Sequence, residues 1–319
     1  MPMTLRRLGA SGIEITPLAL GSWRTFERMS FDDGVAVMRA ARDAGINFLD
    51  DARYDDETGT APIPTGYSEV RFGELFRAAG WRRAETVVAN KLWWEFWPEQ
   101  NAAAELDGSL GRMQFDYVDV IYANPPPDAL DVDTMVRDVA GLIASGRARA
   151  WAVVNWRPDQ LLAASAAATR AGVPQPCAAQ LPYSLVHRAW VEDETMTRAL
   201  DACSAPVVAS FVLAGGVLSG KYGSDRPFGR AAGELADRRY ARAAEVAREL
   251  GELAREVDAT SAALAIAFAF DNPRVATVLF GATRPDQLRQ NVTGVDVADR
   301  LDEAQWDRLR AIGASPAPG

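Results

Sequence analysis

Eight short apolar segments recur along the chain, and segments with helical periodicity separate them. The intervening segments at residues 31–45, 131–146 and 157–172 begin near Asp or Pro and end with Gly, as helices do. Alternating strands and helices require right-handed crossovers between parallel strands. We therefore predict a parallel sheet with strands at residues 15–22, 47–52, 86–91, 117–123, 151–155, 177–183, 206–212 and 276–282.

The number of strands selects between two common α/β architectures. Eight strands close naturally into a (β/α)8 barrel, the TIM barrel, whereas a doubly wound sheet more often opens with a glycine-rich turn, and the chain contains no GxGxxG. We predict one barrel domain over residues 1–319, with a β-hairpin at residues 5–16 covering its bottom. Residues 52–69 and 214–239 interrupt the repeat as long loops after the second and seventh strands, where active-site lids occur.

The charge and the cysteines of the chain limit its partners and its compartment. A formal net charge of -9 argues against nucleic acid or an anionic membrane as a partner. The amino terminus lacks a signal-peptide core and no window is apolar enough to span a membrane, so we expect a cytoplasmic protein. Cys177, Cys203 and the single histidine, His187, form neither a metal cluster nor a disulfide framework, and we expect both cysteines to be buried packing residues.

Polar residues follow several of the predicted strands. The stretch YVDVIYANPPPD reads as a strand that must stop before its three prolines, which places Asn124 at the carboxyl end. Asp50 and Tyr54 follow the second strand, and Lys91 ends the third. In a (β/α)8 barrel the carboxyl ends of the strands carry the active site. These four side chains are therefore candidate catalytic residues.

The same residues belong to motifs that resemble the aldo-keto reductase family. GINFLDDARY, ending at Tyr54, resembles the family's GINFFDTAEVY motif, and VVANK, ending at Lys91, resembles its strand that ends in Lys. AAQLPYSLVHR, LAGGVLSGKY and LFGATRPDQLRQN resemble three further blocks, so the resemblance covers nearly the whole chain. It implies a barrel that binds NADP(H) and transfers a hydride from the nicotinamide to a carbonyl carbon.

The resemblance implies a role for each strand-end residue. Tyr54 would donate the proton to the carbonyl oxygen, and a buried ammonium on Lys91, paired to Asp50, would lower the pKa of the phenol. The family has four residues between the Asp and the Tyr, whereas this chain has three. Either one residue has been lost or Asp51 shares the role of Asp50, and Tyr67 in the following loop is the competing phenol. The alternative is that the candidates are unrelated polar residues.

Asn124 stands where most of the family has His. An amide can donate a hydrogen bond to a carbonyl oxygen but cannot supply a proton, so it suits orientation and oxyanion stabilisation. Its strand resembles that of the potassium-channel β subunits, a branch of the family with an Asn here, which binds its cofactor tightly and reduces carbonyls slowly. The alternative is that Asn124 only caps its strand.

The resemblance also implies which residues bind the cofactor. Val154, Phe211 and Val212 depart from the common residues of the family, and Arg284 is a basic candidate for the 2′-phosphate, which favours NADPH over NADH. Contacts to the nicotinamide half are implied for Gly21, Ser22, Trp23, Asp50, Asn155, Gln180 and Tyr183. Contacts to the phosphates are implied for Leu213, Gly215, Lys221, Arg230, Gly281, Thr283, Arg284, Gln287, Gln290 and Asn291.

An aromatic cluster adds an expectation about the substrate. Trp93, Trp94, Phe96 and Trp97 follow Lys91 and predict an apolar or aromatic substrate wall. We expect an NADPH-dependent reductase of a small aldehyde or ketone. A second hypothesis is a cofactor-bound sensor or partner-binding subunit with slow reductase activity. A lyase or isomerase is the third, and the intact cofactor blocks argue against it.

Overall fold

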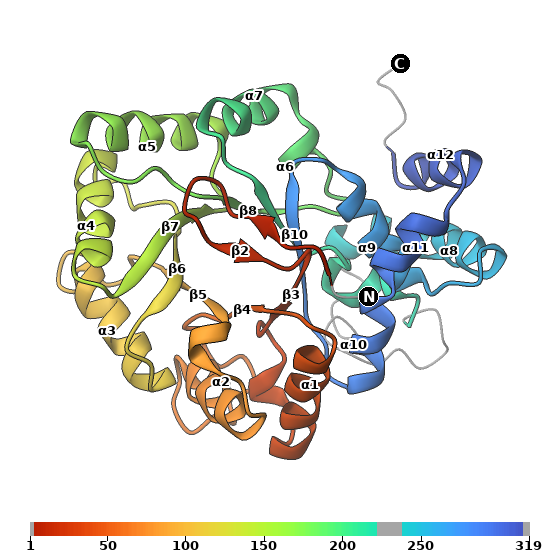
Figure 1. The fold of residues 1–319 in the computed structure, drawn as a ribbon, viewed down its shortest axis with the longest axis horizontal. Helices are drawn as coiled ribbons and strands as arrows, with labels where there is room; N and C mark the ends of the chain where they lie inside the picture. The colour runs from red at the N-terminus through yellow and green to blue at the C-terminus, as the bar shows by residue number, and fades with distance from the viewer. Residues whose placement is uncertain (1–2, 222–237, 315–319) are drawn as a thin grey trace.

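The part of the chain that the structure describes, residues 3–221 and 238–314, forms a closed barrel of eight parallel strands (Figure 1). The structure is a computed structural model. The barrel strands follow chain order from β3 to β10, and β10 closes the ring by pairing with β3. Each overlaps one of the eight predicted segments, so the predicted (β/α)8 barrel is confirmed. The strands are β1 (Arg6–Arg7), β2 (Glu14–Ile15), β3 (Leu18–Gly21), β4 (Phe48–Asp50), β5 (Val87–Leu92), β6 (Val118–Ala123), β7 (Ala148–Val154), β8 (Ala179–Pro182), β9 (Val207–Ser210) and β10 (Val275–Phe280).

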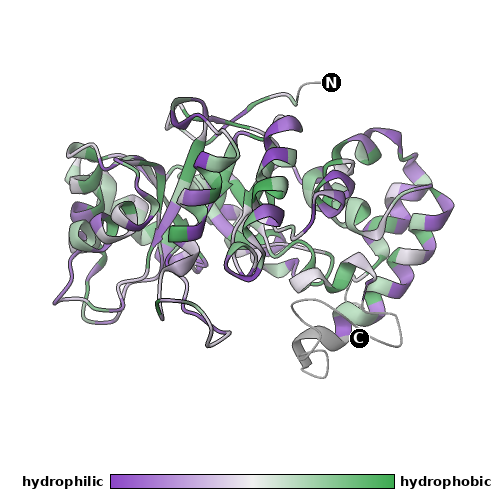
Figure 2. Ribbon diagram, turned by 90° about the horizontal axis from the view of Figure 1, so that it is seen from below, coloured by the Kyte–Doolittle hydropathy of each residue, from purple (hydrophilic) through white to green (hydrophobic). Residues whose placement is uncertain are grey.

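Helices surround the barrel on its outside (Figure 1). The side chains of Ser30 and Asp131 cap two of them by accepting hydrogen bonds from the backbone N–H groups of Asp33 and Thr134. Figure 2 shows mainly hydrophobic strands and outer helices that alternate in hydropathy, as expected for helices with one face on the sheet. The helices are α1 (Phe31–Asp43), α2 (Tyr67–Ala78), α3 (Ala102–Met113), α4 (Val132–Ala144), α5 (Pro158–Ala171), α6 (Ala189–Glu192), α7 (Glu194–Cys203), α8 (Arg238–Glu256), α9 (Ser261–Asp271), α10 (Pro285–Val292), α11 (Gly294–Arg300) and α12 (Glu303–Ala311), with 3-10 turns η1 (Phe26–Arg28), η2 (Arg83–Glu85) and η3 (Ala214–Ser219).

The N-terminal hairpin of β1 and β2 closes the amino end of the barrel, as predicted, and crosses the centre of the ring in Figure 1. Leu8, Ile13 and Ile15 are buried in one cluster with the inward-facing side chains of the barrel strands. The hairpin turn approaches so closely that a Cβ on Gly9 would lie 2.4 Å from the carbonyl oxygen of Cys177. With its φ of +54°, this position therefore requires glycine.

Two long connections leave the carboxyl ends of barrel strands. Residues 51–66 join β4 to α2, in agreement with the predicted loop after the second strand. After the seventh barrel strand, β9, the chain enters η3, and α8 begins at Arg238. Residues 222–237 of that second predicted loop lie outside the described residues.

The two cysteines are free and buried, as predicted, with Cys177 behind the hairpin and Cys203 at the end of α7. Burial raises the pKa of the Cys177 thiol to about 12, so this group packs as an apolar side chain. Among the described residues, every helix is too short or too polar to cross a membrane.

Candidate active site

A cavity of about 370 Å³ opens at the carboxyl ends of the barrel strands. Gly21 and Asp50 are the last residues of β3 and β4, and both face it. The sequence predicts the active site at the carboxyl ends of the strands, because the parallel strands of a barrel all end on the same side. Of the predicted site residues, the cavity brings together Gly21, Trp23, Asp50, Tyr54, Lys91, Asn124, Asn155, Gln180, Leu213, Gly215 and Gly281.

A chain of polar contacts runs through the centre of this cavity. The Lys91 ammonium lies 2.5 Å from Oδ1 of Asp50 and 3.3 Å from the hydroxyl oxygen of Tyr54. The second carboxylate oxygen of Asp50 accepts a hydrogen bond of 2.9 Å from the side chain of Gln180. Asp50 and Lys91 are only 2% and 5% exposed, so this ion pair is shielded from water on all sides except the cavity. The geometry can hold a phenol against a buried cation.

Burial and charge act in opposite directions on the groups of this chain. Burial alone would lower the pKa of Lys91, but the Asp50 carboxylate and Tyr54 together raise that pKa above the usual lysine value. Burial raises the pKa of Tyr54, and the nearby Lys91 charge offsets only part of this effect. Lys91 thus lowers the pKa of the phenol, as expected from the sequence, but the net shift is upward, because the cost of burying the ionised phenol outweighs the attraction of the ammonium.

Tyr54 lies in the cavity, whereas Tyr67, the competing phenol, does not line it. Tyr67 begins α2 at the far end of the loop, which folds back on itself through a bridge between Asp55 and Thr65. The ring of Tyr54 packs edge-on against the indole of Trp93, with centroids 6.1 Å apart. Although this chain has one residue fewer between Asp50 and the tyrosine than the family has, the Tyr54 hydroxyl still contacts the Lys91 ammonium.

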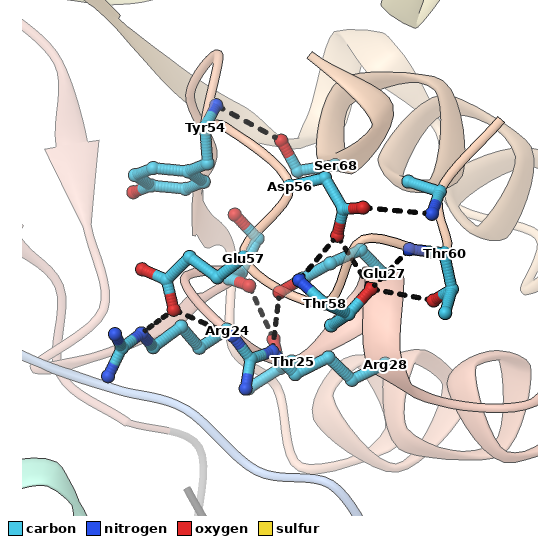
Figure 3. Close-up of polar contacts among 12 residues, drawn as sticks. Arg24, Thr25, Glu27, Arg28, Tyr54, Asp56, Glu57, Thr58, Thr60 and Ser68 are labelled. Carbon is cyan, nitrogen blue, oxygen red and sulfur yellow. Dashed lines mark hydrogen bonds and ion pairs between the residues drawn. The ribbon is translucent and has the colours of Figure 1, made fainter. Parts of the chain in front are cut away.

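Ion pairs fasten the loop after β4 to the segment after β3 (Figure 3). Glu57 accepts from Arg24 at 2.5 Å and from Arg28 at 2.8 Å. Asp56 closes the loop by accepting hydrogen bonds of 2.9 Å from the backbone N–H groups of Thr58 and Ala61. Figure 3 shows the ring of Tyr54 beside this cluster. The loop is therefore held at the side of the cavity.

Asn124 faces the cavity and also caps its strand. Its side-chain amide donates a hydrogen bond of 3.0 Å to the backbone carbonyl oxygen of Leu92, and the backbone carbonyl oxygen of Asn124 accepts a hydrogen bond of 3.0 Å from the indole N–H of Trp94. An Asn amide carries two N–H groups, so one remains beyond the bond to Leu92. The capping and the cavity-facing interpretations of Asn124 are thus compatible.

A second cavity of about 240 Å³ adjoins the first and shares Leu213, Gly216 and Gly281 with it. Arg284, just before α10, pairs with Asp286 at 3.1 Å. The side-chain oxygen of Gln287 accepts from the backbone N–H of Thr283 at 3.0 Å. This cavity brings together the remaining described phosphate candidates, Lys221, Thr283, Arg284, Gln287, Gln290 and Asn291.

Two of the predicted cofactor residues that the structure describes, Ser22 and Tyr183, do not line either cavity. The hydroxyl of Ser22 donates to the Asp51 carboxylate, and the hydroxyl of Tyr183 donates to Glu192 at 2.6 Å. Both follow from alternation along an extended chain: their neighbours face the cavity, so these side chains face the helices. Arg230 lies outside the described residues.

Sequence reasoning missed part of the cavity wall. Of the predicted aromatic cluster, Trp93 lines the cavity, while Trp94 is buried beneath Asn124 and Phe96 is exposed at the surface. Phe211, which departs from the family's common residue, also lines the cavity, and its ring centre lies 6.3 Å from that of Trp23. The other missed residues are Val154, Pro182, Ser210, Val212, Gly216, Leu279 and Phe280. Consecutive residues such as Leu279 and Phe280 both line the cavity, so alternation along a strand does not predict this part of the wall.

Asp51 forms a buried acidic site behind the cavity. It is fully buried beside Ser22, and its Oδ2 atom has no hydrogen-bond partner among the described residues. Glu69, also fully buried, pairs with Arg112 at 2.5 Å. Burial, and then the charge of Glu69, raises the pKa of Asp51 well above its usual value. Asp51 is therefore protonated under conditions in which an ordinary carboxyl is charged, and Asp50 alone makes the contact to Lys91.

We expect Asp51→Asn to reduce the loss of stability that the protein suffers as the pH rises. A carboxyl with a raised folded-state pKa binds its proton more tightly in the folded state, so stability falls as pH rises from about 4, the unfolded value, toward the folded value. An amide does not titrate, so this contribution to the pH dependence of the free energy of unfolding disappears in the variant. Urea unfolding at a series of pH values from about 4 upward measures that dependence. Asp56→Asn is the control, because the Asp56 pKa is lowered to about 2, which makes its contribution disappear at acidic pH instead. An unchanged slope in Asp51→Asn would contradict the assignment.

The structure combines a (β/α)8 barrel with an Asp–Lys–Tyr chain and with amide side chains at the carboxyl ends of its strands. Residues 17–314 match the Aldo/keto reductase family, and the chain belongs to this family, as its motifs predicted. It is 31% identical to a "Probable voltage-gated potassium channel subunit beta" of Oryza sativa subsp. japonica, over 97% of this chain and 96% of that protein. It is 30% identical to a protein of the same description from Arabidopsis thaliana, with the same two coverages.

Proposed function

We propose that the protein reduces a small aldehyde or ketone with NADPH. The observation that carries this proposal is the Tyr54 hydroxyl, held 3.3 Å from the Lys91 ammonium at the wall of the larger cavity. Membership of the Aldo/keto reductase family supports an oxidoreductase. The reaction class follows from the donor set, because a phenol beside a buried cation can give a proton to an oxygen that gains negative charge.

The residues of the two adjoining cavities fit a dinucleotide cofactor. Amide side chains of Asn155 and Gln180 face the larger cavity and suit a carboxamide, while Lys221 and Arg284 in the smaller cavity suit phosphates. The carboxyl ends of β9 and β10 lead from one cavity to the other through shared residues. NADPH, when bound, supplies the hydride.

Each residue of the polar chain has a distinct task in this proposal. Asp50 holds the Lys91 ammonium in place, and Gln180 holds Asp50. Lys91 stabilises negative charge on Tyr54 as the phenol gives its proton to the substrate oxygen. The N–H of Asn124 that is not bound to Leu92 is available to orient the same oxygen. Burial raises the pKa of Tyr54, so the phenol stays protonated at neutral pH, and the Lys91 ammonium acts in the opposite direction by lowering the cost of removing the proton.

The walls of the larger cavity favour an uncharged, apolar or aromatic substrate. Trp23, Trp93 and Phe211 supply its aromatic surface, and Asp50 and Lys91, which neutralise each other, are the charged residues among its described lining. The proposal is tested by following NADPH consumption with an aromatic aldehyde such as benzaldehyde. Consumption that depends on both protein and aldehyde is expected, and none with a heat-unfolded sample.

We expect the protein to bind NADPH about tenfold or more tightly than NADH, a difference of about 1.4 kcal/mol. Arg284 can form a charge-assisted contact to a 2′-phosphate, but Asp286 now occupies its guanidinium at 3.1 Å. Asp286→Asn should therefore increase the preference, and Arg284→Gln should abolish it. Titration calorimetry of both cofactors against the three proteins measures these ratios. Equal dissociation constants in the unmodified protein would contradict the assignment of Arg284.

A second candidate function is a cofactor-bound sensor or partner-binding subunit with slow reductase activity. Two observations favour it. The relatives are described as probable channel subunits, and one N–H of the Asn124 amide is already hydrogen-bonded to the Leu92 carbonyl oxygen. Asn cannot supply a proton as the family's usual His can. Tight NADPH retention through purification together with very slow aldehyde turnover would favour this candidate over a dedicated reductase.

A further inference from the structure

A third cavity, of about 310 Å³, lies at the opposite end of the barrel from Lys91. Its wall contains Pro206 just before β9 and Val275 at the start of β10, which mark the amino ends of two barrel strands. It also contains Arg6 in the hairpin strand β1. It shares no lining residue with the two cavities at the carboxyl ends. Neither the proposed reaction nor the proposed cofactor uses it.

Arg6 is the central feature of this amino-end cavity. Its Nη1 atom donates a hydrogen bond of 2.6 Å to the carbonyl oxygen of Val275, and its guanidinium carbon lies 4.0 Å above the ring centre of Phe270. The side chain is partly buried, and no carboxylate of the described residues forms an ion pair with it. Burial lowers the pKa of Arg6, with no acidic neighbour to offset the effect. The guanidinium is fixed in direction, but its charge is not neutralised.

The other charged residues of the wall leave a positive excess. Arg274 is neutralised by Asp201 through two contacts of 3.0 and 2.8 Å, and Asp271 is neutralised by Arg310 at 2.8 Å. Arg7, exposed on the same hairpin strand, stands across the ladder from Glu14, without an ion pair in the described part of the chain. Arg6 and Arg7 are thus the two cations of the wall that no ion pair neutralises.

We propose that the amino-end cavity binds a small oxyanion, the phosphate group of a small molecule or phosphate itself, through Arg6, with the exposed Arg7 adding positive charge to the wall. A guanidinium presents a planar set of donors that matches phosphate oxygens, and Arg6 is held ready by Phe270 and Val275. A partly buried charge without a counter-ion is costly, so an anion gains more here than at an exposed arginine. The site is independent of the reductase site and offers a second place at which a metabolite can stabilise the fold.

Inorganic phosphate is the probe for this site, compared with chloride at equal ionic strength. We expect saturable binding by equilibrium dialysis or calorimetry, with a dissociation constant of about 1 mM or tighter, and a rise in melting temperature that follows it. Arg6→Gln should weaken the binding at least tenfold. Arg7→Gln changes an exposed side chain, so its folding is secure, and it should weaken the binding by a smaller factor.

Arg284→Gln is the matched control, because it removes one positive charge from the cofactor cleft at the other end of the barrel. Phosphate binding that persists in Arg284→Gln, weakens at least tenfold in Arg6→Gln and weakens by a smaller factor in Arg7→Gln supports the amino-end site. Binding that survives both Arg6→Gln and Arg7→Gln, or that disappears in Arg284→Gln, overturns it and assigns phosphate to the cofactor cleft. An equal effect of chloride overturns it as well, because the response is then general ionic screening.

Discussion

Replacing Tyr54 by phenylalanine should lower kcat/KM for an aromatic aldehyde by roughly 10²- to 10⁴-fold, the usual contribution of a positioned proton donor. The substitution removes one oxygen atom, which contacts Lys91 at 3.3 Å, and leaves the ring against Trp93. Because the cavity walls stay in place, the dissociation constant of NADPH should change little. Steady-state NADPH consumption and a separate fluorescence titration measure the two quantities.

Two further variants make this result interpretable. Tyr67→Phe is the matched control, since Tyr67 lies outside the cavity and its loss should leave the rate unchanged. Asn124→Ala should be milder than Tyr54→Phe, because loss of one oriented donor costs at most about 2.7–4 kcal/mol, and less where water replaces it. Full activity in Tyr54→Phe, or a large loss in Tyr67→Phe, would refute the assignment of the proton donor. An unchanged rate in Asn124→Ala would leave that residue as a strand cap.

The barrel could be predicted from the sequence because its signals are local. Each buried strand is a short run of apolar residues, and the helices between them have their own caps, such as Ser30 and Asp131. The strand ends were also readable: Asp50, Lys91 and Asn124 follow directly from where those runs stop. Register and closure then bring these ends together without further information, since the strands are parallel.

The errors in the site arise from contacts between residues far apart in the sequence. The hydrogen bond from Gln180 to Asp50 joins two strands and the ion pair of Glu57 with Arg24 joins two loops, and nothing local predicts either contact. The motif predicts Ser22 at the cofactor, but its hydroxyl contacts Asp51, because successive side chains of an extended chain point to opposite faces. The sign of the Tyr54 pKa shift needed the depth of burial, which no motif gives.

We expect Lys91→Met to destabilise the protein by about 3–5 kcal/mol, the usual cost of leaving a buried charge without its partner. In this variant the Asp50 carboxylate, 2% exposed, would keep only the hydrogen bond from Gln180. Asp50→Asn should cost a similar amount, because it leaves the ammonium of Lys91 buried beside a neutral amide. Urea unfolding at neutral pH measures both free energies of unfolding.

The double variant Asp50→Asn/Lys91→Met separates the stability of the pair from its catalytic role. With no charge left unpaired, its stability should recover most of the loss, since buried ion pairs are often replaceable by neutral groups. Its reductase activity should not recover, because Tyr54 then has no cation beside it. The raised pKa of Lys91 keeps the amine charged through neutral pH, and its contribution is lost only as pH rises through that folded-state value, so the cycle is flat near neutrality. Additive losses in the double variant would show that the two residues do not act as a pair, and reductase activity in it would exclude Lys91 from the proton transfer.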